Sequence, residues 1–223
     1  MNTLVIGGTS GLGLEIARDF SELGNDVIVS GRHDPNQEGL DFREFDLSKP
    51  ELPRRIGEFV TNLPDISTLV YAPGFFQEGQ ITDLSDEQVD EMLDVCGRGL
   101  IFFVKKVLEK QSKLNELIVV TSTSERIPRL YEPVYNFAKA GAGLYTSAQA
   151  LDPAIGKTLK VLVSGMATPF WAKDGRDTSA YLHPDWVADQ IMSERPKVKE
   201  YRPIDILGPE NEKRVIVDEA LCR

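Results

Sequence analysis

The stretch Thr3-Leu4-Val5-Ile6-Gly7-Gly8-Thr9-Ser10-Gly11-Leu12-Gly13 decides the fold, because a short β-forming run passes directly into glycines. From Leu12 to Leu23 apolar residues recur at helical spacing, and Gly24 then supplies a carboxyl-terminal cap. A strand, a glycine turn and a helix in this order let the backbone approach a pyrophosphate, while free amides at the helix start bind its charge. A glycine run can be a plain turn, but this position favours phosphate binding.

Composition and charge exclude several classes of protein. At 223 residues and 41% hydrophobic content, the chain has the size of one domain, residues 1–223, with a sizeable core. Its formal net charge of −10 disfavours binding to nucleic acid and to anionic membranes, which require a basic surface. Two cysteines and two histidines, without a cluster at ligand spacing, argue against a disulfide framework and a metal site. With no leader pattern and no apolar run of about 18 residues, we expect a soluble cytoplasmic protein.

Short apolar runs alternate with longer amphipathic segments along the whole chain. This alternation predicts an α/β fold, a single doubly wound parallel sheet in a Rossmann-like three-layer αβα domain. Ser85-Asp86-Glu87-Gln88 is a capping box and predicts the start of a helix of about six turns. Residues 31–41 contain Pro35, Asn36 and Gly39, so we expect a loop there. The candidate strands are residues 3–6, 27–30, 42–45, 67–71, 117–121, 160–164 and 203–207.

Tyr135 and Lys139 stand four residues apart in Tyr135-Asn136-Phe137-Ala138-Lys139, so on a helix they share one face. An ammonium beside a phenol favours the phenolate and brings its pKa toward the operating pH of an acid–base catalyst. Ser122, thirteen residues earlier, can supply a second hydrogen bond to a reacting oxygen. Alone, Tyr-x-x-x-Lys also occurs on solvated helix faces, so its weight depends on the rest of the chain.

With the glycine turn, Ser122, Tyr135 and Lys139 resemble the short-chain dehydrogenase/reductase family, in order, from residue 3 to about residue 207. The resemblance implies hydride transfer between a nicotinamide and a carbonyl or alcohol. It implies that Tyr135 is the general acid/base, that Ser122 holds the substrate oxygen, and that Lys139 lowers the pKa of Tyr135 and binds the nicotinamide ribose. The residues implied to contact the cofactor are Gly7, Thr9, Ser10, Gly11, Leu12, Gly13, Asp46, Leu47, Ala72, Gly74, Tyr135, Lys139 and Thr168.

The residues at the end of the second predicted strand indicate which dinucleotide the protein prefers. Members of the family that prefer NAD place an aspartate where this chain has Gly31, and Arg32 can reach a 2′-phosphate with a forked contact. NADP is therefore the expected cofactor and NAD the less favoured one. The alternative is that Arg32 is a solvated charge and that Asp34 turns inward to bind the ribose.

Several positions depart from the family pattern. Cys96 replaces the asparagine that organises a proton path to the lysine, and as a small hydrophobe it also fits the apolar stripe of its helix. Ile6 replaces a threonine, Ser164 a proline, and Tyr71-Ala72-Pro73-Gly74 stands where the family has Asn-Asn-Ala-Gly. These departures leave open a second hypothesis, a non-catalytic NADP-binding sensor or scaffold. A nucleotide-sugar epimerase, which also uses Tyr-x-x-x-Lys, is disfavoured because the segment after Thr168 is short.

The loops after Gly74, Ser122 and Thr168 should form the substrate pocket beyond the carboxyl ends of the strands. An apolar or aromatic carbonyl or alcohol compound fits the side chains expected there, although each of them can instead serve packing. We expect residues 174–179 to form a lid, residues 214–217 to form an extra strand or a subunit contact, and the long helix and tyrosine helix to assemble a homodimer or homotetramer. The expected lining residues are Phe75, Phe76, Arg126, Phe170, Trp171, Tyr181 and Trp186.

Overall fold

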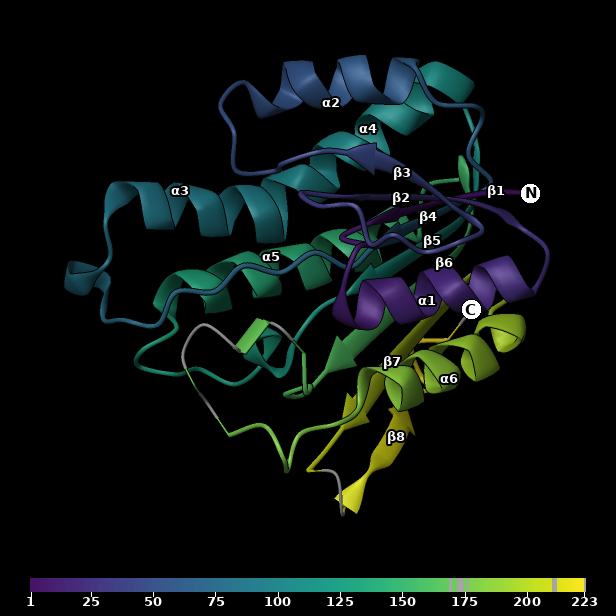
Figure 1. Cartoon of the computed structure of the whole chain (residues 1–223). Coiled ribbons are helices and arrows are strands. Elements are labelled where there is room, and N and C mark those ends of the chain that lie inside the picture. The colour runs from purple at the N-terminus through teal and green to yellow at the C-terminus, as the bar shows by residue number, and fades with distance from the viewer. Residues whose placement is uncertain (169, 172–174, 176, 210–211, 223) are drawn as a thin grey trace.

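The computed structural model describes residues 1–168, 170–171, 175, 177–209 and 212–222, which form one eight-stranded sheet with helices on both faces (Figure 1). The strand order is β3-β2-β1-β4-β5-β6-β7-β8; all neighbours pair in parallel except β7 and β8, which are antiparallel. The predicted doubly wound fold is confirmed. The strands are β1 (Asn2–Ile6), β2 (Asp26–Gly31), β3 (Leu40–Glu44), β4 (Thr68–Tyr71), β5 (Leu114–Val120), β6 (Ile155–Val163), β7 (Tyr201–Leu207) and β8 (Arg214–Val217).

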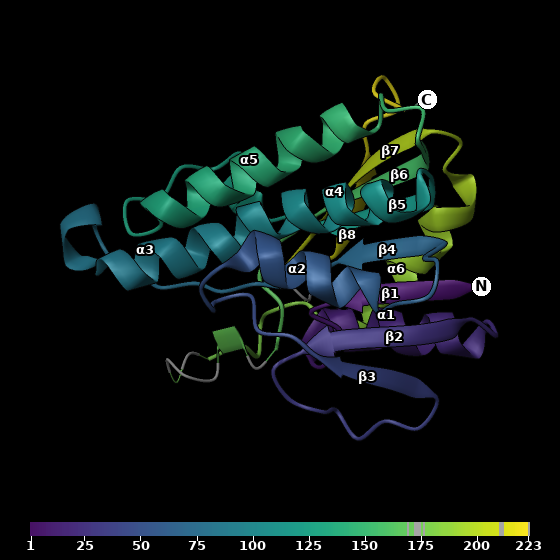
Figure 2. The ribbon, with the colours of Figure 1, turned by 90° about the horizontal axis from the view of Figure 1, so that it is seen from above.

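Two layers of helices cover the sheet. Helices α2, α4 and α5 lie on the face seen in Figure 2, and α1 and α6 lie on the other. The described α-helices are α1 (Gly11–Glu22), α2 (Leu52–Thr61), α3 (Asp86–Leu93), α4 (Gly99–Gln111), α5 (Pro133–Gln149) and α6 (Pro184–Glu194). Residues between β2 and β3 form a loop, as predicted, and β8 confirms the extra strand. A subunit contact at β8 stays a prediction.

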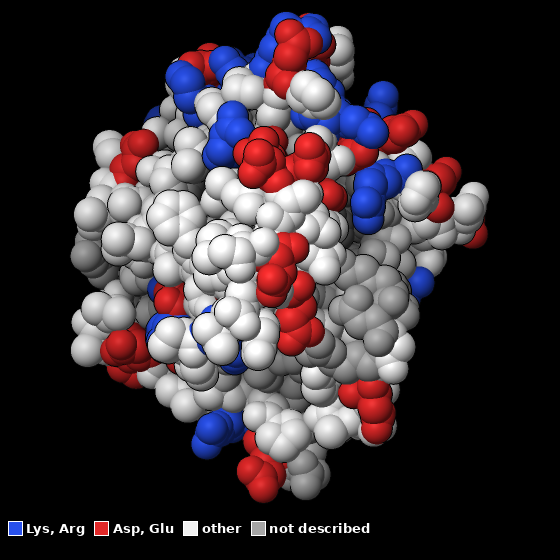
Figure 3. Space-filling view, turned by 90° about the vertical axis from the view of Figure 1, so that its left-hand side faces the viewer, with Lys and Arg blue, Asp and Glu red and all other residues white. Residues whose placement is uncertain are grey.

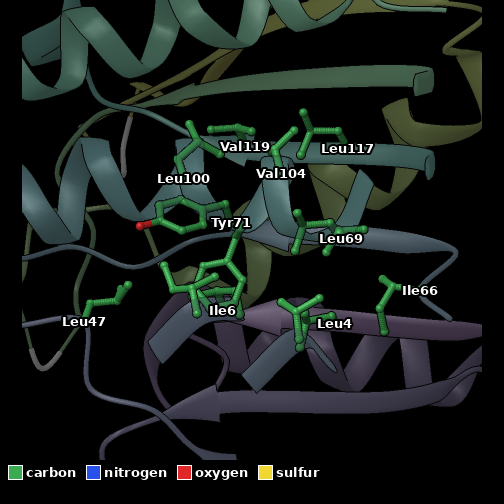
Figure 4. Close-up of a cluster of buried hydrophobic side chains, with 14 of the residues drawn as sticks. Leu4, Ile6, Leu47, Ile66, Leu69, Tyr71, Leu100, Val104, Leu117 and Val119 are labelled. Carbon is green, nitrogen blue, oxygen red and sulfur yellow. The ribbon is translucent and has the colours of Figure 1, made fainter. Parts of the chain in front are cut away.

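Side chains along each strand point alternately to the two faces of the sheet, so the hydrophobic core has two parts. Leu4 and Ile6 of β1 point toward α2 and α4, where Figure 4 shows them with Leu69, Tyr71 and Leu100, whereas Val5 points toward α1 and α6. Both faces of the central strands are apolar because helices cover both. This packing fixes the carboxyl ends of the strands, from which the functional loops depart.

The predicted long helix contains a feature that its sequence pattern did not indicate. It starts at the Ser85 cap as expected, with the Gln88 backbone N–H donating to the Ser85 hydroxyl at 3.3 Å. Between α3 and α4, however, η2 (Asp94–Arg98) is a π-helical turn. A π-turn widens the helix by one residue and frees backbone carbonyls for other partners, and such turns are frequent at functional sites.

Helices α1 and α6 meet around a carboxyl group whose pKa is shifted. The Oδ2 atom of Asp19 is buried and has no hydrogen-bond partner among the described residues. Burial, and then the negative charges of Asp189, Glu22 and Glu15, raise the pKa of Asp19 to about 6. The folded protein therefore holds a proton that the unfolded chain releases above about pH 4. This group's contribution to stability is full below that pH and is lost as pH rises through about 6.

Asp19→Asn is therefore expected to stabilise the protein in neutral buffer. Because the amide carries no charge to bury, we expect Tm to rise by about 2–4 °C at pH 7.5. At pH 4.5, where the carboxyl group is already protonated in the folded protein, the gain should be smaller. Scanning calorimetry at the two pH values measures the difference, and an equal or larger gain at pH 4.5 would show that burial of charge is not its cause.

Within the described residues, no helix is both long and apolar enough to cross a membrane. Nor do three or more histidine, cysteine, aspartate or glutamate side chains of these residues gather where they could hold a metal ion.

Candidate functional site

A cavity of about 970 Å³ lies at the carboxyl edge of the sheet and reaches from Arg32 at one end to Tyr181 at the other. Figure 3 looks onto this edge: much of the surface is uncharged, and charged side chains of both signs gather toward the top, on the side of α2. All the residues predicted from sequence to bind cofactor or to act in catalysis line this one cavity, from Gly7 and Arg32 to Ser122, Tyr135, Lys139 and Thr168. Gly7 and Thr168, which are 161 residues apart in the chain, are thus brought together.

The glycines of the first turn are required by close backbone approaches. Gly7 has a φ of +77°, and a Cβ there would lie 2.7 Å from the Pro73 backbone. A Cβ at Gly13 would lie 2.2 Å from the Gly7 carbonyl oxygen. Gly11, with a φ of +52°, faces the Thr168 side chain. The turn therefore presents bare backbone and the start of α1 to the cavity, a cradle that fits a pyrophosphate.

Arg32 and Asp46 line the part of the cavity that bears on cofactor choice. Arg32 follows β2 and is exposed, and the Asp46 carboxylate accepts hydrogen bonds from the Ser48 hydroxyl at 2.7 Å and amide at 3.0 Å. Burial acts to raise the pKa of Asp46, but the Ser48 bonds and the charges of Lys49 and Arg32 outweigh it and lower the pKa. Asp46 is thus an ionised, braced acceptor within the electrostatic reach of Arg32.

Position 31 requires glycine for a steric reason. A Cβ there would lie 2.2 Å from the Thr9 hydroxyl, so an acidic side chain at this position collides with the glycine turn. Asp34, the alternative ribose ligand, accepts a hydrogen bond from the Asn36 amide at 2.8 Å and is not among the described residues that line the cavity.

The predicted catalytic side chains converge at the other end. Tyr135 and Lys139 lie one turn apart on α5, with the Lys139 Nζ atom 5.6 Å from the centroid of the Tyr135 ring. Lys139 is buried, 4% exposed, and donates to the Val120 carbonyl oxygen at 3.4 Å. Ser122 begins the turn after β5, and its hydroxyl accepts from the Ser124 amide at 3.1 Å.

The pKa of Tyr135 is raised well above its usual value, and burial of the hydroxyl is the main cause. Cys96 and Glu132 add to the rise, whereas the Ser122 side chain, within hydrogen-bonding reach, and the Arg129 charge oppose it. Lys139 was predicted to lower this pKa, but burial dominates and the net shift is upward. Tyr135 is therefore a protonated phenol at neutral pH.

A buried ion pair anchors the turn that carries Ser122. Glu125, in η3 (Thr123–Glu125), accepts from the Lys160 ammonium at 2.8 Å and from the Thr121 hydroxyl at 2.7 Å. A Cβ at Gly143 of α5 would lie 2.2 Å from the Glu125 carboxyl carbon, so this glycine makes room for the carboxylate. The pair joins the Ser122 turn to β6 and to the helix of Tyr135.

Where the chain departs from the family pattern, Tyr71 and Cys96 make hydrogen bonds of their own to the backbone. The Tyr71 hydroxyl donates to the Val95 carbonyl oxygen at 2.7 Å, inside the π-turn. A Cβ at Gly99 would lie 2.3 Å from that hydroxyl, so the contact depends on this glycine. The Cys96 thiol donates to the Phe75 carbonyl oxygen at 3.3 Å and lies in the core, which agrees with its interpretation as a small hydrophobe. Tyr71 thus joins β4 to the long helix.

Aromatic side chains form the substrate end of the cavity. Phe76 packs edge-on against Tyr135, with ring centroids 5.3 Å apart, and stacks on Phe170 at 6.1 Å. Trp171 contacts both Phe170 and Tyr181. With Phe75, these residues confirm most of the predicted lining. In the proposed lid, residues 174 and 176 lie outside the described residues.

Two predicted lining residues are not in the cavity. Arg126 forms an ion pair with Asp205 at 2.6 Å, because the turn after Ser122 aims it across β7. Trp186 lies in the first turn of α6, which carries it into the core beside α1, with Lys213 4.8 Å above its ring. Both residues follow loops that were expected to line the pocket, but the sequence does not indicate the direction in which their side chains point.

A polar network that was not predicted lies next to Ser122. The Ser124 hydroxyl, in η3, meets the Glu132 carboxylate, and Arg129 donates to both side chains. All three line the cavity. Two signals were available: Ser122 and Ser124 are separated by one residue, and Glu132 precedes Tyr135 by one helical turn.

Comparisons with known proteins agree with this geometry. Residues 1–177 match the family described as short chain dehydrogenase. The chain is 32% identical over 126 residues to the uncharacterized oxidoreductase YvrD of Bacillus subtilis, covering 49% of this chain but only 47% of that protein. It is 23% identical over 203 residues to the uncharacterized oxidoreductase SH0585 of Staphylococcus haemolyticus, covering 85% and 88%.

A similar solved structure is the short-chain dehydrogenase from Sphingobium yanoikuyae in complex with NADPH. Its TM-score is 0.78 at 17% identity, and the alignment covers 91% of this chain and 87% of that one, which shows a shared fold. The family match extends over the glycine turn, the Ser122 turn and the Tyr135 helix. The chain therefore belongs to the short chain dehydrogenase family.

Proposed function

We propose that the protein is an NADP(H)-dependent oxidoreductase that interconverts a carbonyl compound and an alcohol. The observation that carries the proposal is the convergence of Ser122, Tyr135 and Lys139 in the same cavity as the glycine turn. When bound, the nicotinamide supplies or accepts the hydride. A cradle for a pyrophosphate and a protonated phenol in one cavity are the two parts that such a reaction needs.

Each of the three side chains has a proposed part in carbonyl reduction. Ser122 donates a hydrogen bond that holds the substrate oxygen. Tyr135 gives its proton to that oxygen, and its raised pKa ensures that the proton is present across the neutral range. Lys139 carries a buried positive charge beside the ring, which stabilises the phenolate left behind and binds the nicotinamide ribose. Alcohol oxidation follows the reverse order and is favoured by high pH.

NADP is the proposed dinucleotide because Arg32 lies at the cavity end and Gly31 leaves no room for an acidic side chain. Charge-assisted hydrogen bonds are worth about 1.5–3 kcal/mol, so Arg32→Leu is expected to raise KM for NADPH about 10- to 100-fold. KM for NADH should change by less than about twofold. Arg43→Leu, which removes an exposed cation of β3, is the matched control. A wild-type preference for NADH would contradict this choice.

The substrate end fits an apolar or aromatic carbonyl or alcohol compound. Phe75, Phe76 and Phe170 supply flat apolar walls beside Tyr135, and offset or edge-to-face packing on such walls holds a ring in place. The two free cysteines agree with a reducing compartment, which supports the proposed cytoplasmic location.

We also propose that α4 and α5 assemble the homodimer or homotetramer. Phe137 and Leu144 of α5 are 72% and 75% exposed, and Ile101 of α4 is 40% exposed. Large apolar side chains exposed on neighbouring helices are typical of contacts between subunits. Light scattering should show an oligomer that Leu144→Glu dissociates; a monomeric wild-type protein at micromolar concentration would contradict the proposal.

A further inference from the structure

A chain of hydrogen bonds leads away from the catalytic end of the cavity. The Ser122 side chain lies within hydrogen-bonding reach of the Tyr135 hydroxyl. The Ser122 hydroxyl donates to the Ser124 hydroxyl at 3.2 Å, and the Ser124 hydroxyl donates to Glu132 Oε2 at 2.7 Å. Two hydroxyl oxygen atoms, those of Ser122 and Ser124, therefore lie between the phenol and a carboxylate.

The four members of this chain differ in burial, but all of them line the cavity. Ser124 is 4% exposed, whereas the Glu132 side chain is 17% exposed and lines the cavity. Tyr135 and Ser122 are partly buried, so Ser124 in the middle is the most shielded member, and the Glu132 carboxylate at the end of the chain faces the cavity. Such an arrangement of hydroxyl groups, each both a donor and an acceptor, conducts a proton when every group rotates once.

The other side chains near Tyr135 offer no comparable path among the described residues. The Cys96 thiol is bonded to the Phe75 carbonyl oxygen, and Lys139 Nζ to the Val120 carbonyl oxygen. In the described part of the chain, neither bond leads on to a further titratable side chain. Each reduction removes one proton from Tyr135, and the phenol must regain it before the next turnover.

We propose that Ser122, Ser124 and Glu132 form the proton relay of Tyr135, an inference that rests on the proposed reductase function. After Tyr135 protonates the substrate oxygen, Ser122 gives its proton to the phenolate and takes one from Ser124. Ser124 in turn takes the proton of Glu132, which has been protonated by solvent. The net change is one proton moved from solvent to Tyr135, with every hydroxyl restored, and alcohol oxidation runs the relay in reverse.

Arg129 and Asn136 hold the relay in place. Arg129 donates to Glu132 Oε2 at 3.0 Å, to the Ser124 hydroxyl at 2.7 Å and to the Thr123 hydroxyl at 3.0 Å. Asn136 donates to the Ser124 carbonyl oxygen at 2.6 Å. The charged and titratable groups that face Tyr135 are thus Arg129 and Glu132 before α5, Lys139 within α5, and Cys96 of η2. Arg129 orients the carboxylate toward Ser124.

The first test is Glu132→Gln, which keeps an acceptor for Ser124 but cannot carry the proton. We expect kcat for NADPH-dependent reduction to fall about 10- to 100-fold, with little change in KM for substrate or NADPH. The solvent deuterium isotope effect on kcat should increase, because proton delivery becomes rate-limiting. Small diffusible acids such as acetic acid or imidazolium should restore turnover in proportion to their concentration. Glu87→Gln, on the exposed start of α3, is the matched control.

The second variant, Ser124→Ala, breaks the chain in the middle and leaves both ends in place. It should show the same loss of kcat and the same larger isotope effect. A Glu132→Gln protein with unchanged kcat overturns the relay, and so does a loss of kcat without buffer rescue and without a change in isotope effect, because that result indicates a structural role. If the wild-type protein turns over no carbonyl compound, the proposed function fails and the relay with it.

Discussion

Tyr135→Phe is expected to lower kcat/KM for carbonyl reduction by about 10²- to 10⁴-fold, the usual contribution of a positioned general acid. The phenol is the proposed proton donor of the site, and phenylalanine keeps the ring that packs on Phe76 while removing only the hydroxyl group. Because the change leaves the cofactor cradle intact, the Kd for NADPH should stay within about twofold. Single-turnover kinetics and fluorescence titration measure the two quantities.

Tyr131 provides the matched control for this prediction. It lies on the same stretch of chain, four residues before Tyr135, but it is 49% exposed and is not among the described residues of the cavity wall. Tyr131→Phe should leave kcat/KM unchanged. Retained turnover in Tyr135→Phe would exclude this tyrosine as the acid.

Gly13→Ala is expected to abolish cofactor binding. The added Cβ would lie 2.2 Å from the Gly7 carbonyl oxygen and 3.3 Å from the Gly8 Cα, and backbone atoms cannot rotate away as a side chain would. The turn must open, which displaces the amides that face the cavity. Overpacking of this kind costs about 1–3 kcal/mol of stability, and we expect no saturable NADPH binding at concentrations that saturate the wild type.

Gly57→Ala is the control for the glycine substitution. Gly57 lies inside α2, where a Cβ would make an ordinary contact of 3.5 Å with the flexible Lys106 side chain. Alanine in a helix interior is favoured by about 1 kcal/mol over glycine, so this variant should be more stable and bind NADPH normally. If calorimetry shows that Gly13→Ala binds NADPH like the wild type, the glycine turn does not form the cradle.

The fold could be predicted because its signals are local. The run from Leu4 into Gly7, the Ser85 capping box and the Tyr135–Lys139 spacing each lie within a few residues. The alternation of short apolar runs with amphipathic segments predicts the remaining strands and helices. The convergence of the predicted site residues in one cavity follows from the parallel topology, because carboxyl ends of neighbouring strands share an edge.

What could not be predicted depends on contacts between distant residues. The π-turn at Asp94–Arg98 has no signal in the apolar spacing of the sequence, yet it frees the Val95 carbonyl for Tyr71. The direction of Trp186 depends on where α6 packs, and the sign of the Tyr135 pKa shift depends on burial, which no residue spacing reveals. The meeting of Ser124 with Glu132 depends on how the loop between η3 and α5 returns.

The most direct test of the central claim is NADPH oxidation by the wild-type protein with a panel of aldehydes, ketones and quinones, including aromatic members. The proposed function predicts saturable turnover, one alcohol formed for each NADPH consumed, and its loss in Tyr135→Phe. NADPH binding without turnover of any member of the panel would contradict catalysis and favour a non-catalytic NADP-binding sensor or scaffold.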